Sequence, residues 1–307
     1  MCGDNNSSEC GGVVMKELKG TYVFKQNGIE IARSNNIITT TGKNSILQYL
    51  SGSISDWAAE LAVGAMETSA TVNDKALSFE IARTPVTLKS YKRYGDFDLI
   101  VVKGTIDKTV QGNLYEIGIF PSTTTNTFGK RDQLIITDFS DISNWAGDYA
   151  TNAYVPQGEL SPRVGAYSVI LAANKNITNN QSVINLSSYS VIDTIDILAY
   201  IPNGSSGTLT LTLIDTTGTS KTLTYTISGT GYTILSSNIT SDILSLSTIN
   251  SIELSTTADI TLDAIRVSII QELTPLTSMV SRSAPGSPIA KVYGSPLDIE
   301  YYLELRY

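Results

Sequence analysis

The 307-residue sequence contains no histidine. This absence excludes a Ser-His-Asp or Cys-His catalytic relay, a histidine-ligated zinc site and imidazole proton transfer near neutral pH. Catalysis would have to use paired carboxylates, a lysine base or a metal ion held by oxygen ligands. Most common hydrolase mechanisms are therefore closed to this chain.

Basic residues are also few: the sequence has 21 Lys and Arg and 29 Asp and Glu, which gives a net charge of −8. Residues 134–270 hold four basic and eleven acidic side chains, a net charge of −7, and the other 17 basic and 18 acidic residues leave −1. A phosphate backbone is bound by several lysines or arginines on one face, so we expect no nucleic-acid partner. The uneven charge predicts two modules of different composition.

Long apolar runs are missing as well. No stretch approaches the roughly 18 consecutive apolar residues that span a bilayer, so we expect no membrane insertion. Residues 1–12 have neither the basic segment nor the apolar run of a secretion signal. They contain both cysteines, Cys2 and Cys10, which are too few ligands for a structural zinc site. We interpret residues 1–12 as a flexible tail.

The sequence does contain many short β-branched and aromatic runs separated by turn residues. In residues 20–34 two such runs flank Asn27-Gly28, which predicts a β-hairpin with a type I′ turn. After Thr39, apolar residues between Ile46 and Leu50 recur at helical spacing and predict one short helix. Further strands are expected at residues 76–83, 98–107 and 114–120.

From residue 135 onward the runs become shorter and richer in Ser and Thr. Regularly spaced short strands separated by Asn, Gly, Ser and Thr are typical of a β-sandwich or jelly roll. Such strands are expected at residues 167–172, 194–200, 208–214, 221–227, 251–255 and 265–270.

The last ten residues alternate between apolar and polar side chains. One set is Ile299, Tyr301, Leu303, Leu305 and Tyr307, and the other is Asp298, Glu300, Tyr302, Glu304 and Arg306. This period of two predicts a half-buried strand, which needs a sheet to join. We therefore predict a mainly β protein with a discontinuous platform domain, residues 13–133 and 271–307, that contains one or two short helices. A jelly-roll domain, residues 134–270, is inserted into it.

The platform residues contain four motifs and a tyrosine-rich last strand. They are an Asn-rich segment before a helix start (Asn35–Gly42), an apolar run that ends in small residues (Leu61–Gly64), a Leu-x-x-Glu-x-x-Arg run (Leu77–Arg83) and a Glu-Ile-Gly-Ile-Phe segment (Glu116–Phe120). Together they resemble a group of tailed-bacteriophage virion proteins. The resemblance implies a structural role and brings no catalytic residues.

The inserted segment opens with Asp138–Trp145, continues with Gly165–Leu171 and ends with Leu262–Val267. These segments resemble jelly-roll carbohydrate-binding modules. In such modules the last segment supplies an Asp to a structural calcium site near the start of the domain. The resemblance therefore implies Asp263 as a candidate calcium ligand and Asp138 as a second one, although an Asp in a turn also commonly caps that turn.

Sugar binding needs aromatic rings exposed as stacking platforms beside polar groups. The candidate rings are Trp145, Tyr149 and Tyr154. For any single tyrosine, packing in a core or at an edge is the alternative role. Alternation places Tyr225 on the apolar face with Leu223 and Ile227, and it buries Tyr200 with Leu198.

Paired carboxylates are the remaining route to catalysis. Asp138 with Asp141, or Asp193 with Asp196, could form such a pair, and a glycosidase needs two carboxyl groups about 5–10 Å apart across a cleft. A spacing of three in a Ser/Asn-rich loop is the ordinary pattern of turns. We therefore expect no enzymatic activity.

The leading hypothesis is a surface-exposed structural component of a bacteriophage virion, made in the host cytoplasm. Its platform domain would dock onto other virion proteins, and its jelly roll would bind host-surface glycans or decorate the particle. Virion sites repeat by symmetry, so a homo-oligomer is expected. The alternatives are a carbohydrate-binding accessory module of a secreted bacterial system and a glycan-cleaving enzyme.

Overall fold

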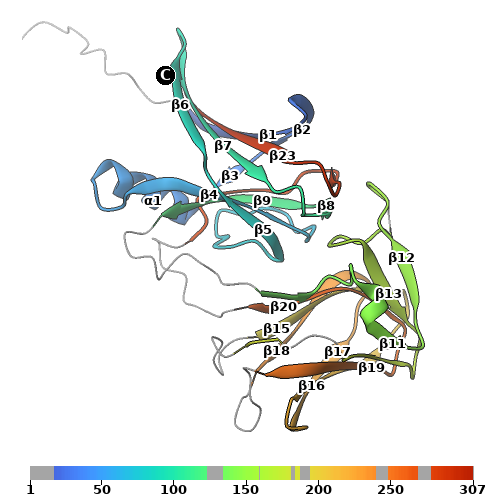
Figure 1. The fold of residues 1–307 in the computed structure, drawn as a ribbon. Coiled ribbons are helices and arrows are strands. Elements are labelled where there is room, and N and C mark those ends of the chain that lie inside the picture. The colour runs from blue at the N-terminus through green and yellow to red at the C-terminus, as the bar shows by residue number, and fades with distance from the viewer. Residues whose placement is uncertain are drawn as a thin grey trace, which may run out of the picture.

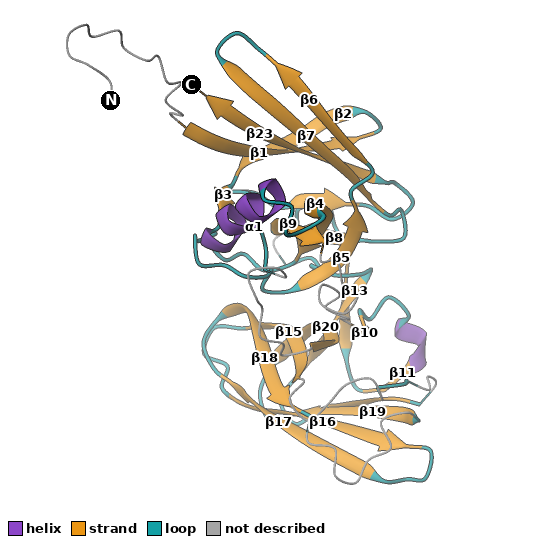
Figure 2. Cartoon of the chain, turned by 90° about the vertical axis from the view of Figure 1, so that its left-hand side faces the viewer, coloured by secondary structure: helices purple, strands orange, loops and turns teal. Residues whose placement is uncertain are grey.

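The computed structural model describes residues 17–122, 134–158, 160–180, 184–186, 194–239, 248–268 and 278–306. These residues are mainly β, which confirms the predicted fold class. They contain one α-helix, α1 (Thr40–Leu50), and one short 3-10 helix (Ile142–Asn144). Their strands form four large antiparallel sheets that lie one above another in Figure 1 and Figure 2. None of the described helices is long and apolar enough to cross a membrane.

The first sheet, here called the outer platform sheet, has the strand order β2-β1-β23-β7-β6. Its strands are β2 (Ile29–Asn35), β1 (Glu17–Gln26), β23 (Leu297–Arg306), β7 (Phe97–Ile106) and β6 (Leu88–Arg93). The predicted hairpin joins β1 to β2, and Asn27 and Gly28 adopt φ values of 52° and 78° as a type I′ turn requires. The predicted last strand is also confirmed, since Ile299, Tyr301 and Leu303 are buried and their neighbours are not. Tyr307 lies outside the described residues.

The second sheet, the inner platform sheet, has the order β3-β21-β9-β4-β5. Its strands are β3 (Ile37–Ile38), β21 (Ser281–Ser283), β9 (Glu116–Ser122), β4 (Asp56–Gly64) and β5 (Glu80–Pro85), beside a small ladder of β8 (Gly112–Leu114) and β22 (Ile289–Lys291). The two platform sheets enclose one core, in which Tyr22 and Tyr301 meet at 4.8 Å between ring centroids and Leu61 and Ile119 are fully buried. Strands from both ends of the chain therefore build the platform.

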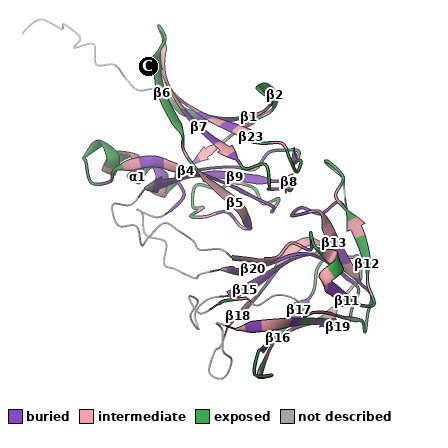
Figure 3. Cartoon of the chain, viewed as in Figure 1, coloured by how far each residue is buried: buried purple, intermediate pink, exposed green. Residues whose placement is uncertain are grey.

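The predicted helix is present, and among its apolar residues Ile46 packs against the platform core. Leu47 and Leu50 are 64% and 73% exposed, and the end of α1 is exposed in Figure 3. The small residues Gly42 and Ser45 are the buried residues of the helix. A Cβ at Gly42 would overlap with the Val280 carbonyl group, so the close approach requires glycine at this position.

The remaining sheets form the sandwich. The inner sandwich sheet runs β12-β13-β20-β15-β18, with β10 also paired to β20, and the outer sandwich sheet runs β11-β14-β19-β16-β17. The inner strands are β12 (Ala150–Ala153), β13 (Tyr167–Leu171), β20 (Ile260–Ser268), β15 (Thr194–Ile201), β18 (Gly231–Asn238) and β10 (Leu134–Thr137). The outer strands are β11 (Trp145–Gly147), β14 (Asn176–Asn179), β19 (Ile249–Thr256), β16 (Gly207–Asp215) and β17 (Ser220–Ile227). Tyr225 is buried between them with Leu223 and Ile227, as predicted.

The inner sandwich sheet is covered on both faces. Ile195 and Ile197 of β15 point into the sandwich core, whereas Leu198 belongs to a second cluster with Ala65 and Phe79 of the platform. Tyr200 follows Leu198 on that second face and is only half-buried, so alternation grouped the two residues correctly but assigned them to the wrong core. Strands of a sheet that is buried on both faces have nearly continuous apolar sequences.

Replacement of Gly42 by Ala reverses the usual helix-propensity effect. Alanine normally stabilises a helix interior by about 1 kcal/mol relative to glycine, but here the methyl group meets backbone, so we expect Gly42→Ala to destabilise the protein by about 1–3 kcal/mol. Asn44→Ala, at an exposed position of α1, is the matched control and should be neutral or slightly stabilising. Urea unfolding of both variants checks this, and an increased midpoint for Gly42→Ala would refute the packing argument.

Candidate functional site

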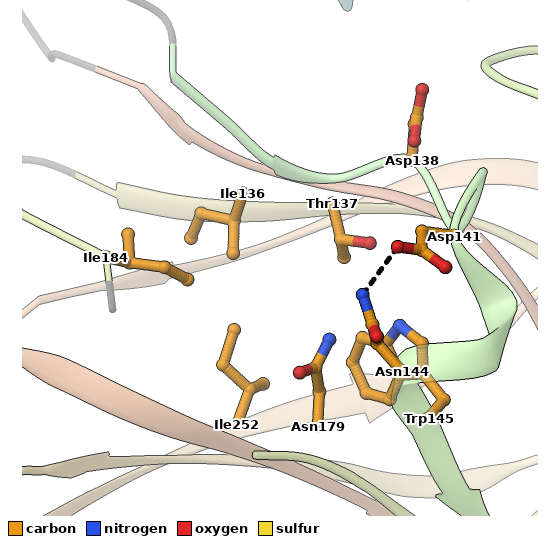
Figure 4. A pocket seen from close by; sticks show the side chains of 9 residues that line it. All are labelled: Ile136, Thr137, Asp138, Asp141, Asn144, Trp145, Asn179, Ile184 and Ile252. Carbon is orange, nitrogen blue, oxygen red and sulfur yellow. Dashed lines mark hydrogen bonds between the residues drawn. The ribbon is translucent and has the colours of Figure 1, made fainter. Parts of the chain in front are cut away.

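A pocket of about 250 Å³ opens at the edge of the sandwich, where the two sheets separate. Its lining residues come from both sheets and from the segment between β10 and β11, as Figure 4 shows: Ile136, Thr137, Asp138, Asp141, Asn144, Trp145, Asn179, Ile184 and Ile252. The lining thus combines apolar side chains with carboxylates and amides.

The polar side of the pocket is held in place by its own hydrogen bonds. Asp141 accepts hydrogen bonds from Ser143 Oγ at 2.7 Å and from Asn144 Nδ2 at 2.6 Å, and Asp138 accepts one from the Ser140 backbone N–H at 3.0 Å. These are the turn and cap contacts that the spacing of three predicts. A carboxylate has about four acceptor positions, so Asp141 retains acceptor capacity toward a ligand. The Asp138 carboxylate points away from the other lining side chains in Figure 4.

The apolar side continues the sandwich core. Ile252 is buried in that core, and Ile136 and Ile184 pack against it while lining the pocket. Trp145 is only 5% exposed and packs against Phe139, with ring centroids 5.0 Å apart. Trp145 therefore offers a ligand the part of its ring that lines the pocket, and not a free stacking face.

The two predicted tyrosines occupy different places. Tyr149 is half-buried against the sandwich core, and its hydroxyl lies 3.1 Å from the Trp145 carbonyl oxygen and 3.3 Å from that of Ile142. It supports the turn that forms one pocket wall. Tyr154 instead donates a hydrogen bond to the Gly112 carbonyl of the platform at 3.2 Å, and burial raises its pKa to about 12. The structure therefore brings Trp145 and Tyr149 together and leaves Tyr154 apart from them.

Tyr154 lies in a junction between sandwich and platform that the sequence did not predict. Its centre is an antiparallel bridge between Gly112 and Val164. The Asn113 N–H donates to the Arg163 carbonyl at 3.1 Å, and the Gly165 N–H donates to the Gln111 carbonyl at 2.9 Å. Backbone hydrogen bonds thus join the two parts directly.

The Arg163 side chain extends from the sandwich into the platform. Its guanidinium lies between the rings of Tyr115 and Tyr232, 3.8 and 3.9 Å from their centroids, and it donates to the Ala65 carbonyl at 3.0 Å and to Glu67 at 3.3 Å. Its side chain is 8% exposed. A cation held between two aromatic faces in a desolvated site is strongly favoured over a neutral replacement.

Asp263, the predicted calcium ligand, supports the backbone of that arginine. Its two carboxylate oxygens accept the Arg163 N–H at 2.7 Å and the Val164 N–H at 3.1 Å. Burial raises the pKa of Asp263 to about 7, against the effect of these two donors. No group of three or more acidic or cysteine side chains suited to a metal ion occurs among the described residues. Calcium at Asp263 and Asp138 stays a prediction, and the contacts seen give Asp263 a role in the junction.

A second arginine crosses the junction. Arg266 donates to Asp196 at 3.0 Å and to the Ser78 carbonyl at 2.9 Å, and its guanidinium lies 4.0 Å from the centroid of the Phe79 ring. Asp196 is thus engaged in an ion pair, and Asp193, its proposed catalytic partner, lies outside the described residues. The acidic segment 134–270 contains only four basic residues, and two of them lie at this junction. This scarcity of basic residues was the one indication of the junction that the sequence offered.

The platform loop that receives both arginines is held by a further buried ion pair. Glu116 accepts hydrogen bonds from the Ser78 and Phe79 backbone N–H groups, both at 2.8 Å, and from Arg282 at 2.7 Å. Arg282 also donates to Asp74 at 2.7 Å. Two of the motifs that carry the virion resemblance, Leu77–Arg83 and Glu116–Phe120, therefore meet in this network.

Comparisons with known proteins give fold likenesses at low similarity. A scan of protein-family models and a search of curated proteins found no match. Among solved structures, a xylan-binding domain of carbohydrate-binding family 22 matches at 12% identity with a TM-score of 0.31, over 49% of this chain and 100% of that one. An exo-beta-agarase matches at 17% identity with a TM-score of 0.33, over 46% of this chain and 25% of that one. A tailspike protein domain of bacteriophage CBA120 matches at 15% identity with a TM-score of 0.30, over 43% of this chain and 20% of that one. The match thus spans a quarter or less of the agarase and the tailspike.

One expectation is corrected by these matches. Several are glycoside hydrolases, including agarases and the catalytic domain of an alpha-1,3-glucanase. The expectation that this protein is not an enzyme is therefore withdrawn, and glycan cleavage becomes an activity to be measured.

Breaking the Arg266–Asp196 pair should be costly, because it leaves a buried carboxylate without its cation. We expect Arg266→Met to lower the free energy of unfolding by about 3–5 kcal/mol. Arg306→Met is the control, since Arg306 pairs with Glu304 at the exposed end of β23 and such pairs contribute about 0–1 kcal/mol. Equal losses in the two variants, measured by urea unfolding, would contradict a special role for the junction.

Asp263 should make the protein less stable as the pH rises. Its folded pKa of about 7 lies above the value of about 3.9 for an unfolded Asp, so its contribution is fully present below pH ~4 and is lost as the pH rises to ~7. The variant Asp263→Asn should lack this slope, so we expect its melting temperature minus that of the parent to rise between pH 4 and pH 7. Asp259→Asn, which changes an exposed residue that accepts the Ala173 N–H, should keep the slope of the parent.

Proposed function

We propose that the sandwich binds a glycan in the edge pocket, and that the platform attaches it to the surface of a bacteriophage virion as part of a homo-oligomer. The observation that carries the glycan proposal is the pocket itself, a concave site with an apolar wall of Ile136, Ile184 and Ile252 opposite the carboxylate of Asp141. Ligand sites generally combine such walls with a few polar groups that fix orientation.

A sugar suits both sides of this pocket. Its C–H face can pack on the isoleucines and on the accessible part of Trp145. Its hydroxyls can donate to the Asp141 carboxylate and exchange hydrogen bonds with the Asn144 and Asn179 amides. The acceptors are already oriented by turn contacts, so little side-chain entropy is lost when a ligand binds.

The junction supports the second half of the proposal. A domain that presents a pocket from a larger particle must be held at a fixed orientation, and the buried arginines and shared backbone hydrogen bonds supply that connection here. Two of the motifs that resemble virion proteins, Leu77–Arg83 and Glu116–Phe120, lie in the part of the platform that receives the sandwich. Virion proteins and further copies of this chain are therefore the proposed partners.

Substitution of the polar wall should weaken binding without unfolding the protein. On a glycan array probed with the full chain, we expect Asp141→Ala to lower affinity for the recognised glycan about tenfold or more, as for loss of a charge-assisted hydrogen bond. Asn179→Ala removes a neutral hydrogen bond and should lower the affinity by a factor of roughly 2–10. Thr226→Ala, an exposed position on β17, is the control and should bind like the parent.

Three results would separate the parts of this proposal. No binding to any glycan by the folded parent would reject the pocket as a glycan site. Release of reducing sugar from the bound glycan, abolished in Asp141→Ala, would show that the pocket cleaves its ligand. Absence of the protein from purified phage particles by mass spectrometry would reject the virion location and leave the glycan site intact.

A further inference from the structure

We propose that the edge pocket holds a single sugar ring and disfavours acidic glycans such as uronates and sulfated sugars. This inference rests on the proposed glycan function and specifies its ligand class. It follows from the charge, the hydrogen-bonding groups and the size of the pocket, which are taken in turn.

The described lining residues of the pocket include negative charges and no positive charge. Asp138 and Asp141 line it, and no Lys or Arg is among its described lining residues. The basic residues of the sandwich are Arg163, Lys175, Lys221 and Arg266. The two arginines are buried in the junction, and Lys175 forms an ion pair with Asp148.

Lys221 is the remaining cation, and it lies on β17. That strand is separated from β19, which contributes Ile252 to the pocket, by the whole of β16. The sandwich thus has no cation in the pocket lining to receive an acidic sugar, and its net charge of −7 adds unfavourable long-range potential.

The hydrogen-bonding groups favour hydroxyl donors. Asp141 acts only as an acceptor, and its turn contacts leave acceptor positions free. A sugar hydroxyl can donate to it in a charge-assisted bond, whereas a uronate or sulfate group brings acceptors of the same charge. Selectivity therefore includes a repulsive element against the wrong ligand class.

The volume of the pocket suits one sugar ring. About 250 Å³ lies below the range of roughly 300–1,000 Å³ typical of pockets for drug-sized ligands. Such a site accommodates a terminal or branching residue more readily than an internal stretch of polysaccharide.

The test uses the full chain on an array that carries neutral oligosaccharides of several configurations beside their uronic-acid, sulfated and amine-bearing counterparts. We expect at least tenfold tighter binding of the best neutral glycan than of its acidic counterpart. Asp141→Asn keeps the side-chain shape but removes one charge, so it should reduce this ratio severalfold. The control is Asp148→Asn, because the Asp148 side chain lies in the same domain and is 72% exposed. This variant makes the same change in net charge and should leave the ratio unchanged.

Each outcome is decisive. Equal or tighter binding of acidic glycans, or weaker binding of the amine-bearing counterpart than of the acidic one, overturns the selectivity and leaves the proposed glycan function standing. An unchanged ratio in Asp141→Asn, or an equal change in Asp148→Asn, overturns the assignment of selectivity to this pocket. Failure of every glycan class to bind rejects the proposed function itself.

Discussion

The arrangement of this protein depends on two buried arginines, Arg163 and Arg266, that leave an acidic sandwich and enter a nearly neutral platform. Their charges are removed from water, so each must be compensated by close partners. Arg163 has two aromatic faces, a carbonyl and Glu67, and Arg266 has Asp196, the Phe79 ring and a carbonyl. Because these partners come from both parts of the chain, the contacts are complete only when sandwich and platform are correctly joined.

The same requirement extends into the platform. The arginines bind carbonyls and rings at and around residues 65–80, whose conformation is fixed by the buried Glu116 carboxylate and its partner Arg282. Arg282 lies in β21, close to the end of the chain, whereas Glu116 begins β9. A chain of buried ionic contacts thus connects the late strands of the platform, its central strand and the sandwich. Removal of one member leaves an uncompensated charge, so the network favours a single docking geometry.

The edge pocket is separate from the junction, and this separation has a functional consequence. Tyr154 and Asp263 serve the junction, whereas Asp138, Trp145 and Tyr149 line or support the pocket. Variation of the pocket lining can therefore change the ligand without loss of the attachment between the two parts. The pocket wall depends on local turn contacts of Asp141, and the junction depends on contacts between residues far apart in sequence.

The sequence by itself determined the secondary structure of this protein to a large extent. The Asn27-Gly28 turn, the alternating residues 298–306 and the Ser/Thr-rich strands after residue 160 follow from backbone preferences and a period of two, which act over a few residues. The tertiary structure alone decided which faces these elements bury. Leu47 and Leu50 have helical spacing yet remain exposed, whereas Gly42 and Ser45 are buried, and Leu198 lies under the platform and not in the sandwich core. The partners of Arg163, Arg266 and Asp263 could not be predicted from the sequence either. A buried charge is compensated by the groups that folding brings within hydrogen-bond distance, and no local sequence pattern identifies those groups.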